Sequence, residues 1–252
     1  MRHHQTGHTA WWMTGPAPDL VLLHGFSDAA DCWTPLLPGL AGLGGTLAID
    51  ARGHGASALP RGPVGPAPQA ADVAAALEPV TTGPAVIVGH SMGAVTAAQL
   101  AADRPDLVSA LVLEDPPCDA YADGTVRGVP HWLATARATP YPDRIAACRE
   151  QNPRWPTDEL APWATAKTDI DPEYCRRPTA PAPPLTIILA AVACPVLLLH
   201  GSPQHGGMVT PADADALRRA GDGRLTAVRL PNAGHNPRRE ARKDFLNALH
   251  AW

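Results

Sequence analysis

One serine in this 252-residue chain has the surroundings of a nucleophile. Ser91 is the centre of the segment 89–93, Gly-His-Ser-Met-Gly, which follows the apolar run 85–88 and precedes the helix-like stretch 94–100. A sharp turn from strand to helix holds a serine hydroxyl clear of the backbone, and flanking glycines let strand and helix approach without a Cβ clash. The pattern predicts a nucleophile elbow with Ser91 at its tip.

Three further segments occur in the chain order that such a site requires. Residues 19–26 form an apolar strand pattern that ends in His-Gly-Phe, residues 48–57 carry Asp-Ala-Arg-Gly-His-Gly, and residues 230–236 end in Gly-His-Asn. Together with the elbow, these segments resemble the α/β-hydrolase superfamily over nearly the whole chain. The resemblance implies the α/β-hydrolase fold, with a mostly parallel central sheet, helices on both faces and an inserted helical lid. It does not imply one particular reaction.

The rest of the chain supplies the elements that would position these segments. Short runs rich in Val, Ile and Leu alternate with helical patterns, which favours a mostly parallel sheet covered on both faces. The expected strands lie near residues 9–13, 20–23, 46–49, 85–88, 110–113, 196–200 and 225–230. The expected helices lie near residues 33–40, 69–77, 92–103, 211–220 and 238–251. Because the N-terminal part is short for this superfamily, we expect its early antiparallel hairpin to be truncated.

Between residues 116 and 192 the alternation gives way to proline-punctuated helical pieces. We therefore expect residues 1–115 and 193–252 to form the core domain and residues 116–192 to form the lid (cap) insertion that the resemblance implies. The insertion holds six of the twelve aromatic residues, namely Tyr121, Tyr141, Tyr174, Trp132, Trp155 and Trp163. Either these side chains form only the lid's own core, or the three tryptophans contact a bulky apolar or ring-bearing substrate.

A serine hydroxyl is a poor nucleophile at neutral pH, so a base must lie within hydrogen-bonding reach of it. By the resemblance this base is His235, which follows the last expected strand and precedes the C-terminal helix. His205 is the rival candidate. The other histidines of the motifs fit turn or strand-end positions, namely His24, His54, His90 and His200.

The resemblance also places two backbone N–H groups around the oxyanion of an acyl-transfer intermediate. They belong to Met92, directly after the nucleophile, and to Phe26, directly after the His-Gly turn. Loss of one such donor costs roughly 10² to 10³ in rate. Gly25 and Ser27 flank the second donor and are expected to contact the substrate. Ser27 and Asp28 are expected to hydrogen-bond a polar group of it.

The third member of a catalytic triad departs here from the common pattern of the superfamily. Most relatives carry the acid a few residues past the strand pattern 196–200, where this chain has Gln204, whose amide cannot stabilise an imidazolium by charge. Some branches place the acid after the strand that follows the nucleophile helix, and here that strand ends in Glu114 and Asp115. Side chains alternate along a strand, so only one of the two can face His235. Asp115 matches the spacing of those branches, and Glu114 stays open as the alternative acid.

Composition argues against several other classes of protein. With 20 Lys and Arg against 24 Asp and Glu, the net charge is −4, and the scattered basic residues predict no nucleic-acid partner. No apolar run reaches the roughly 20 residues of a membrane span, and the polar start lacks a signal-peptide core, which indicates a cytoplasmic protein without a membrane partner. The five cysteines have no metal-like spacing, and we expect neither a metal nor a cofactor. We interpret the histidines near the N-terminus as part of a solvated terminal segment, and a homodimer is left open.

Three functions fit these residues. The leading one is a cofactor-free serine esterase or lactonase that cleaves an ester or lactone of a bulky apolar or ring-bearing small molecule through an acyl-enzyme on Ser91. The second uses the same pocket for carbon-carbon bond hydrolysis or for a lyase or cyclase step. The third is a non-catalytic ligand-binding protein on the same scaffold, which the glutamine at position 204 favours.

Overall fold

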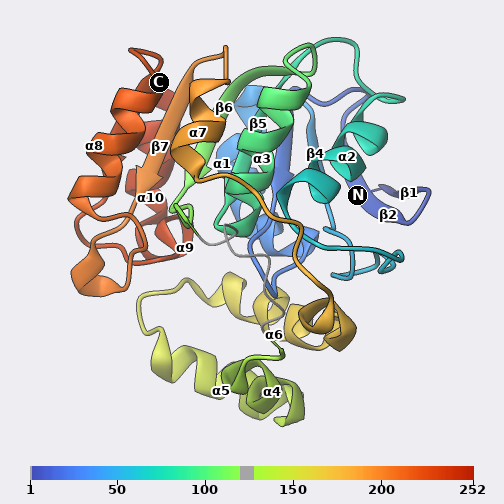
Figure 1. The fold of residues 1–252 in the computed structure, drawn as a ribbon. Helices are drawn as coiled ribbons and strands as arrows, with labels where there is room; N and C mark the ends of the chain where they lie inside the picture. Colours follow the sequence, from blue (N-terminus) through green and yellow to red (C-terminus); the bar gives the residue numbers. More distant parts are fainter. Residues whose placement is uncertain (1, 120–127) are drawn as a thin grey trace.

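The computed structural model describes residues 2–119 and 128–252, and these residues are built around an eight-stranded sheet (Figure 1). The strands follow the spatial order β1-β2-β4-β3-β5-β6-β7-β8. They are β1 (Arg2–Thr6), β2 (Thr9–Thr14), β3 (Leu20–Leu23), β4 (Thr46–Ile49), β5 (Ala85–His90), β6 (Val108–Glu114), β7 (Val196–His200) and β8 (Leu225–Arg229). β1 and β2 run antiparallel to their neighbours, and the other strands are parallel to one another. This is the mostly parallel sheet that the alternating pattern predicts.

The N-terminal hairpin is complete, so the expectation of a truncated hairpin is wrong. β1 pairs with β2 along its whole length, and β2 then pairs with β4. Gly7 has a φ of +59° in the turn between them, a conformation that favours glycine. The expected solvated segment is therefore an edge strand, on which the ring of His4 stacks against Trp11 with centroids 4.3 Å apart. The sequence of β1 is polar, so an apolar strand pattern could not reveal it.

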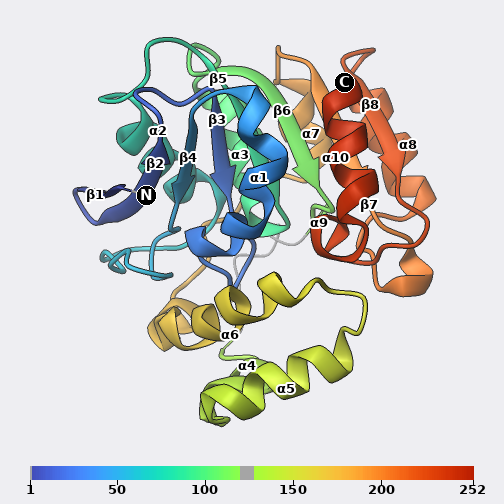
Figure 2. The same ribbon diagram turned by 180° about the vertical axis from the view of Figure 1, so that it is seen from behind.

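Helices cover both faces of the sheet (Figures 1 and 2). The α-helices are α1 (Leu37–Leu40), α2 (Pro66–Leu77), α3 (Met92–Asp103), α4 (His131–Ala138), α5 (Tyr141–Gln151), α6 (Leu160–Asp169), α7 (Leu185–Ala190), α8 (Pro211–Ala220), α9 (Pro237–Glu240) and α10 (Arg242–Ala251). The 3₁₀ helices are η1 (Ala30–Leu36), η2 (Ala41–Leu43), η3 (Thr157–Glu159), η4 (Pro172–Arg176) and η5 (Pro203–His205). Within the described residues, no helix combines the length and the apolar character needed to cross a bilayer.

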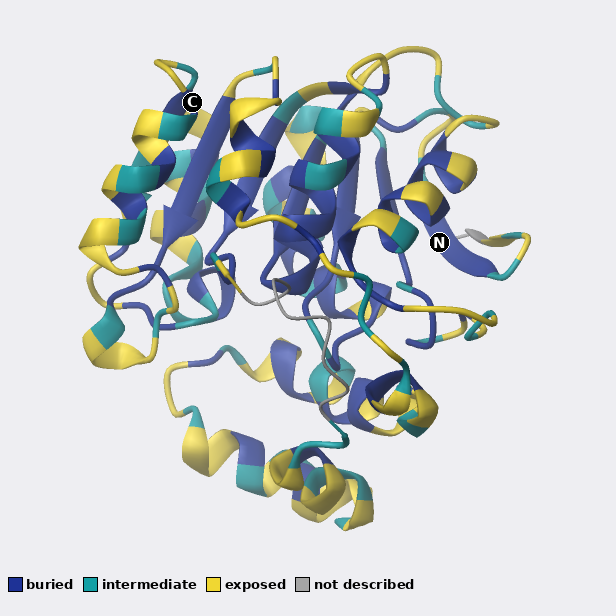
Figure 3. Ribbon diagram, in the orientation of Figure 1, coloured by how far each residue is buried: buried dark blue, intermediate teal, exposed yellow. Residues whose placement is uncertain are grey.

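The strand side chains divide between two apolar clusters because successive residues of a strand point to opposite faces. In β5, Ile87 belongs to the cluster formed with α2, α3, α7 and α8, whereas Val88 belongs to the cluster formed with η1, α1 and α10. Figure 3 shows the strands almost wholly buried, with the exposed residues of the flanking helices facing outward. The core therefore lies on both sides of the sheet.

In the described part of the chain, four α-helices and two 3₁₀ helices lie between β6 and β7, within the expected insertion 116–192. α4, α5 and α6 lie beyond the carboxyl ends of the parallel strands (Figures 1 and 2). α7 packs on the sheet instead, where Leu185, Ile188 and Leu189 join the same apolar cluster as α3 and α8. Tyr121 lies outside the described residues.

The glycines of the elbow are required by close backbone contact. A Cβ added to Gly93 would overlap the carbonyl oxygens of Leu23 and His24, and a Cβ added to Gly89 would overlap the carbonyl oxygen of Gly93. The first turn of α3 therefore packs directly on the ends of β3 and β5. Neither glycine can carry a side chain without moving one of these elements.

We expect Gly93→Ala to lower the free energy of unfolding by about 2 kcal/mol or more, because the added methyl forces backbone apart in a closely packed region. Gly42→Ala is the matched control, since a Cβ there meets no heavy atom within 4 Å. Urea unfolding followed by circular dichroism measures both. Equal midpoints for the two variants would contradict the close approach at the elbow.

Candidate active site

Ser91 lies at the tip of the tight turn between β5 and α3. Its φ of +51° falls in the left-handed region, which a serine adopts only where the surrounding structure enforces it. The Ser91 amide donates to the carbonyl of Glu114 at 2.9 Å. An added Cβ on Gly25 would lie 3.3 Å from the Cβ of Ser91, so the turn after β3 lies directly against the serine. The elbow geometry that the sequence predicts is present.

His235 lies in the loop after β8 and pairs with Asp115. The distance from its Nδ1 to Oδ2 of Asp115 is 2.7 Å. Asp115 is fully buried, and its carboxylate also accepts from the amides of Gly201, at 3.2 Å, and Met208, at 2.8 Å. Because a carboxylate only accepts hydrogen bonds, Nδ1 carries the proton and Nε2 of the neutral ring is free to accept one. This is the arrangement that base and acid have in a catalytic triad.

Glu114 has a different partner from Asp115. Its Oε1 accepts from the backbone amide of Arg238 at 2.7 Å, and its Oε2 accepts from Nη1 of the same arginine at 2.9 Å. Burial raises the pKa of Glu114, and Arg238 opposes that shift. Asp115 has a φ of +42°, so the chain turns at the end of β6 and the two neighbouring carboxylates reach different partners. The structure brings Asp115, and not the alternative Glu114, to His235.

The segment after β7 supplies neither partner of this pair. Gln204 lies in η5, where its Oε1 accepts from the hydroxyl of Ser202. His205 is exposed in the same 3₁₀ helix and lines a different cavity together with Glu240. The histidine paired with a buried carboxylate is His235, and the rival His205 has no such partner among the described residues.

Two backbone amides adjoin Ser91 in the positions expected of oxyanion donors. Met92 is the first residue of α3, so its amide has no acceptor within the helix. Phe26 follows Gly25 in the turn after β3, and within the described ranges its amide donates to no backbone carbonyl. Amides left without an internal acceptor beside a nucleophile suit the negative charge of a tetrahedral intermediate.

A group of buried charges lies behind these loops, and we call it the buried ion cluster. It consists of Asp28, Glu114, Glu159, Lys167, Arg238 and Arg239. Asp28 accepts from Lys167 at 3.1 Å, from Arg238 at 3.1 Å and from Arg239 at 2.9 Å. Burial alone would raise the pKa of the Asp28 carboxyl, but these three cations hold it well below its usual range.

Lys167 connects α6 to the turn that carries Phe26. Its Nζ donates to the carbonyl of Ser27 at 2.8 Å and to the hydroxyl of Ser27 at 3.0 Å. Ser27 is buried and has a φ of +62°. Buried cations therefore bind both side chains, and neither residue lines the substrate-side cavity described below, so their expected contacts with substrate stay a prediction.

Two of the tryptophans expected to contact substrate cover the buried ion cluster instead. Trp155 faces the guanidinium of Arg239 at 4.7 Å, and Trp163 faces the ammonium of Lys167 at 4.9 Å, each measured to the ring centroid. The two indoles also pack edge to face, with centroids 6.4 Å apart. Desolvated cations attract aromatic faces, and local sequence could not show that these two indoles pack on buried charges. The expectation that Trp155 and Trp163 bind substrate stays a prediction, and neither lines the cavity described next.

A cavity of about 330 Å³ adjoins the two amides and has the size of a small-molecule site. We call it the substrate-side cavity, and its walls include Phe26, Met92, Trp132 and Tyr174. Trp132 lies edge-on to Phe26 with centroids 6.3 Å apart. Of the three tryptophans expected to contact substrate, Trp132 is the one that lines this cavity.

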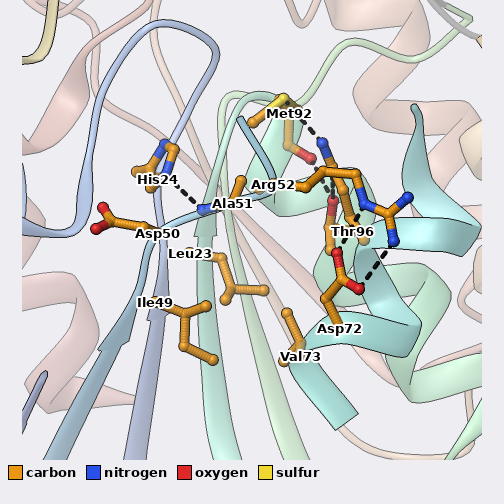
Figure 4. A pocket seen from close by; sticks show the side chains of 12 residues that line it. Leu23, His24, Ile49, Asp50, Ala51, Arg52, Asp72, Val73, Met92 and Thr96 are labelled. Carbon is orange, nitrogen blue, oxygen red and sulfur yellow. Dashed lines mark hydrogen bonds and ion pairs between the residues drawn. The ribbon is translucent and has the colours of Figure 1, made fainter. Parts of the chain in front are cut away.

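The loop after β4 is held by a second buried ion pair (Figure 4). Arg52 donates through Nε to Oδ2 of Asp72 at 2.7 Å and through Nη2 to Oδ1 at 2.8 Å. Asp50 accepts from the amides of Ala30, at 2.7 Å, and Ala56, at 3.0 Å. The space of about 20 Å³ beside these groups is too small for a substrate. Arg52 and Asp50 therefore brace the loop.

Three buried histidines near the site are held in the neutral form. Burial lowers the pKa of His24, lowers that of His54 to about 3, and, together with Arg238, lowers that of His90 well below its ordinary value. Nε2 of His90 donates to the carbonyl of His235 at 2.9 Å. The elbow thus also supports the loop that carries the paired histidine.

Candidate metal ligands do not gather in the parts of the chain that the structure describes. All five cysteines are free thiols, and Cys32, Cys148 and Cys175 are buried. Within residues 2–119 and 128–252, no three His, Cys, Asp or Glu side chains come together as metal ligands would.

Comparison with known proteins gives matches in sequence and in structure. A family model described as the alpha/beta hydrolase family matches residues 20–248. The chain is 35% identical over 101 residues to a 2-(acetamidomethylene)succinate hydrolase of Mesorhizobium japonicum, covering 40% of this chain and 36% of that protein. It is 39% identical over 102 residues to an esterase of Mycobacterium tuberculosis, covering 40% of this chain and 34% of that protein. An enol-lactonase structure from Burkholderia xenovorans LB400 superposes with a TM-score of 0.67 at 21% identity, covering 99% of this chain and 98% of that chain.

The matched segments thus span little more than a third of these two curated relatives, which have 36% and 34% of their lengths covered. The likeness to the enol-lactonase extends over nearly the whole chain, but at 21% identity it shows the fold alone.

We expect Glu114→Gln to destabilise the protein by about 3 kcal/mol, because it removes a buried partner of Arg238 while preserving shape. Asp106→Asn is the control, since it breaks an exposed ion pair with Arg104 and should leave the urea midpoint nearly unchanged. Urea unfolding of both variants measures the difference. If Glu114→Gln unfolded at the same urea concentration as the wild type, the structural role assigned to this carboxylate would be wrong.

The free energy of unfolding should decrease as the pH falls below about 6.5, because His24, His54 and His90 have lowered pKa values only in the folded state. Their stabilising contribution is complete above the ordinary histidine pKa, and it is lost on acidification by up to about 1.4 kcal/mol per pH unit for each histidine. Urea unfolding at about pH 7.5 and about pH 5.5 measures this decrease in the free energy of unfolding. The decrease should be smaller in His54→Gln than in the wild type, because the variant lacks one of the three histidines. An equal decrease in that variant would contradict the neutral state of His54.

Proposed function

Because the chain belongs to the α/β-hydrolase family, we propose that it is a cofactor-free serine hydrolase that cleaves an ester or lactone of a small molecule. One observation carries this proposal: the buried carboxylate of Asp115 binds Nδ1 of His235 at 2.7 Å, at the same edge of the sheet as the strained turn of Ser91. A histidine oriented by a buried carboxylate can accept a proton from a serine hydroxyl, which is the requirement of acyl transfer.

The reaction begins when Oγ of Ser91 attacks the carbonyl carbon of the substrate and His235 takes the hydroxyl proton on Nε2. Asp115 stabilises the resulting imidazolium through Nδ1. The oxyanion accepts hydrogen bonds from the amides of Phe26 and Met92. Collapse of this intermediate breaks the bond to the leaving oxygen, which takes the proton from His235 and departs as the alcohol.

Water completes the cycle by hydrolysing the acyl-enzyme. His235 accepts a proton from the water, and the hydroxide equivalent adds to the acyl carbon at Ser91. The second intermediate then releases the carboxylic acid, and Oγ of Ser91 takes back the proton from His235. One ester and one water give one acid and one alcohol, so no cofactor is needed.

The substrate class follows from the substrate-side cavity and from the names of the relatives. Phe26, Met92, Trp132 and Tyr174 offer apolar and aromatic surface, which suits a substrate with a bulky apolar or ring-bearing part. The relatives include an esterase and an enol-lactonase, and these names support an ester or a lactone as the substrate here. We further propose that α4–α6 serve as the lid over this cavity.

The non-catalytic interpretation rests on Gln204, which occupies the common position of the acid. Its support weakens because His235 has a carboxylate partner from β6 instead. A carbon-carbon hydrolase, lyase or cyclase would use the same residues. A lyase or cyclase can be told from an esterase by measurement, because it forms no acyl-enzyme on Ser91.

We expect a fluorophosphonate probe to add once to the wild type and not at all to Ser91→Ala, because such probes react with a serine activated by a neighbouring base. Intact-mass spectrometry after timed exposure measures the adduct. A folded wild type that stays unlabelled would contradict an activated Ser91.

Asp115→Asn should lower kcat for an ester substrate by roughly 10⁴ with the fold intact, because the imidazolium loses its charged partner. Gln204→Ala is the control and should keep the wild-type rate, since Gln204 contacts Ser202 and not His235. Initial rates with phenyl acetate measure the activity of each variant, and circular dichroism spectra show whether its fold is intact. If Gln204→Ala lost more activity than Asp115→Asn, the acid would have been assigned to the wrong segment.

A further inference from the structure

One charged side chain lines the otherwise neutral substrate-side cavity. Among the described residues, Arg177 is the single charged group in its wall, and the other members are apolar, aromatic or uncharged. The same cavity is bounded by Phe26 and Met92, whose amides adjoin Ser91. A molecule bound with its carbonyl at Ser91 can therefore extend toward the guanidinium of Arg177.

The guanidinium of Arg177 has unused donors. Its Nε is buried and has no hydrogen-bond acceptor in residues 2–119 and 128–252. Among the described residues, the carboxylate that pairs with Arg177 is that of Glu173, which lies 3.8 Å from that Nε, beyond hydrogen-bonding distance. Glu173 also lies 3.7 Å from Nη1 of Arg176, so one carboxylate faces two guanidinium groups and a net positive charge remains.

The backbone on both sides of Arg177 is held in place. The Arg177 amide donates to the carbonyl of Glu173 at 3.1 Å, at the end of η4. Beyond it, the carbonyl of Pro178 accepts from the amide of Val64 at 3.0 Å, and the amide of Ala180 donates to the carbonyl of Val64 at 2.7 Å. A cation on a fixed backbone loses less entropy when it binds a ligand.

A carboxylate is the chemical partner that this environment fits. A guanidinium presents paired N–H groups that match the two oxygens of a carboxylate, and the bond is strengthened where water is excluded. No acidic side chain of the described residues lines the cavity, and Glu173, which faces Arg177 at 3.8 Å, lies outside its lining. We propose that Arg177 binds a carboxylate at the distal end of the acyl part, so that the preferred substrates are half-esters of dicarboxylic acids or carboxylated lactones. This inference rests on the proposed hydrolase function and names its substrate class.

The experiment compares pairs of phenyl esters that differ only at the far end of the acyl chain. One member of each pair is a phenyl half-ester of glutaric or adipic acid, and the other carries a primary amide in place of the free carboxylate. The ratio of kcat/KM between acid and amide is measured for the wild type, Arg177→Met, Arg177→Lys and Arg176→Met. Ser91→Ala gives the spontaneous rate. Arg176 is the matched control, because it is exposed, also faces Glu173 and does not line the cavity.

We expect the wild type to favour at least one acid over its amide by about tenfold or more, as a charge-assisted hydrogen bond would produce. Arg177→Met should bring the ratio close to one, mainly through a higher KM for the acid, because the carboxylate is bound equally before and during the reaction. Arg177→Lys should retain part of the preference, and Arg176→Met should retain all of it. A wild-type ratio of one or less, or an equal loss in Arg176→Met, overturns the assignment of Arg177 while leaving ester hydrolysis intact.

A binding measurement separates this inference from the proposed function. Titration calorimetry of glutarate, with glutaramide as the neutral control, needs no turnover. If no ester is cleaved, binding of glutarate that Arg177→Met abolishes and Arg176→Met preserves would support the carboxylate site and reject the hydrolase. Absence of glutarate binding together with equal cleavage of acid and amide esters would reject the carboxylate site and retain the hydrolase.

Discussion

The buried ion cluster removes six charged groups from water, and their pairing with one another offsets much of the lost hydration. Its members come from loops that also carry the residues of the proposed mechanism. Asp28 follows Phe26 closely, Glu114 directly precedes Asp115, and Arg238 lies shortly after His235. Displacing any one loop would leave a buried charge without its partner. The relative positions of oxyanion donor, acid and base are therefore held by one electrostatic constraint.

The same cluster fixes one side of the segment 116–192, the expected insertion, to loops of the sheet. Lys167 reaches the turn after β3 from α6, and Glu159 pairs with Arg239 at 3.1 Å. Trp155 and Trp163 cover these cations and exclude water from them. The other side of the insertion, with Trp132, faces the substrate-side cavity. The aromatic residues of the insertion thus serve two purposes, one in shielding buried charge and one in shaping the cavity.

Two adjacent carboxylates at the end of β6 have separate tasks because the backbone turns between them. Glu114 neutralises Arg238, and its pKa is raised by burial. Asp115 accepts three hydrogen bonds, one of them from His235. If the two residues exchanged partners, Arg238 would lose the carboxylate that neutralises it, and His235 would lose the carboxylate that orients it. The positive φ of Asp115 is the local feature that makes the division feasible.

The sequence alone determined the features that depend on short-range pattern. Apolar runs of strand length predicted most of the parallel strands, and the glycine spacing around Ser91 predicted the elbow, because both follow from periodicity and from the space that a Cβ needs. The order of the motifs indicated His235 as the base. It reduced the acid to two neighbouring residues, Asp115 and Glu114.

Only the tertiary structure decided features that depend on contacts between distant segments. The polar strand β1 is defined by its pairing with β2, and the partner of each carboxylate is defined by loops more than a hundred residues away. The contacts of Ser27, Trp155 and Trp163 were also decided by the fold, because Lys167 and Arg239 reach them from other parts of the chain. A buried charge must find its counterion wherever the fold places one, and no local pattern encodes that choice.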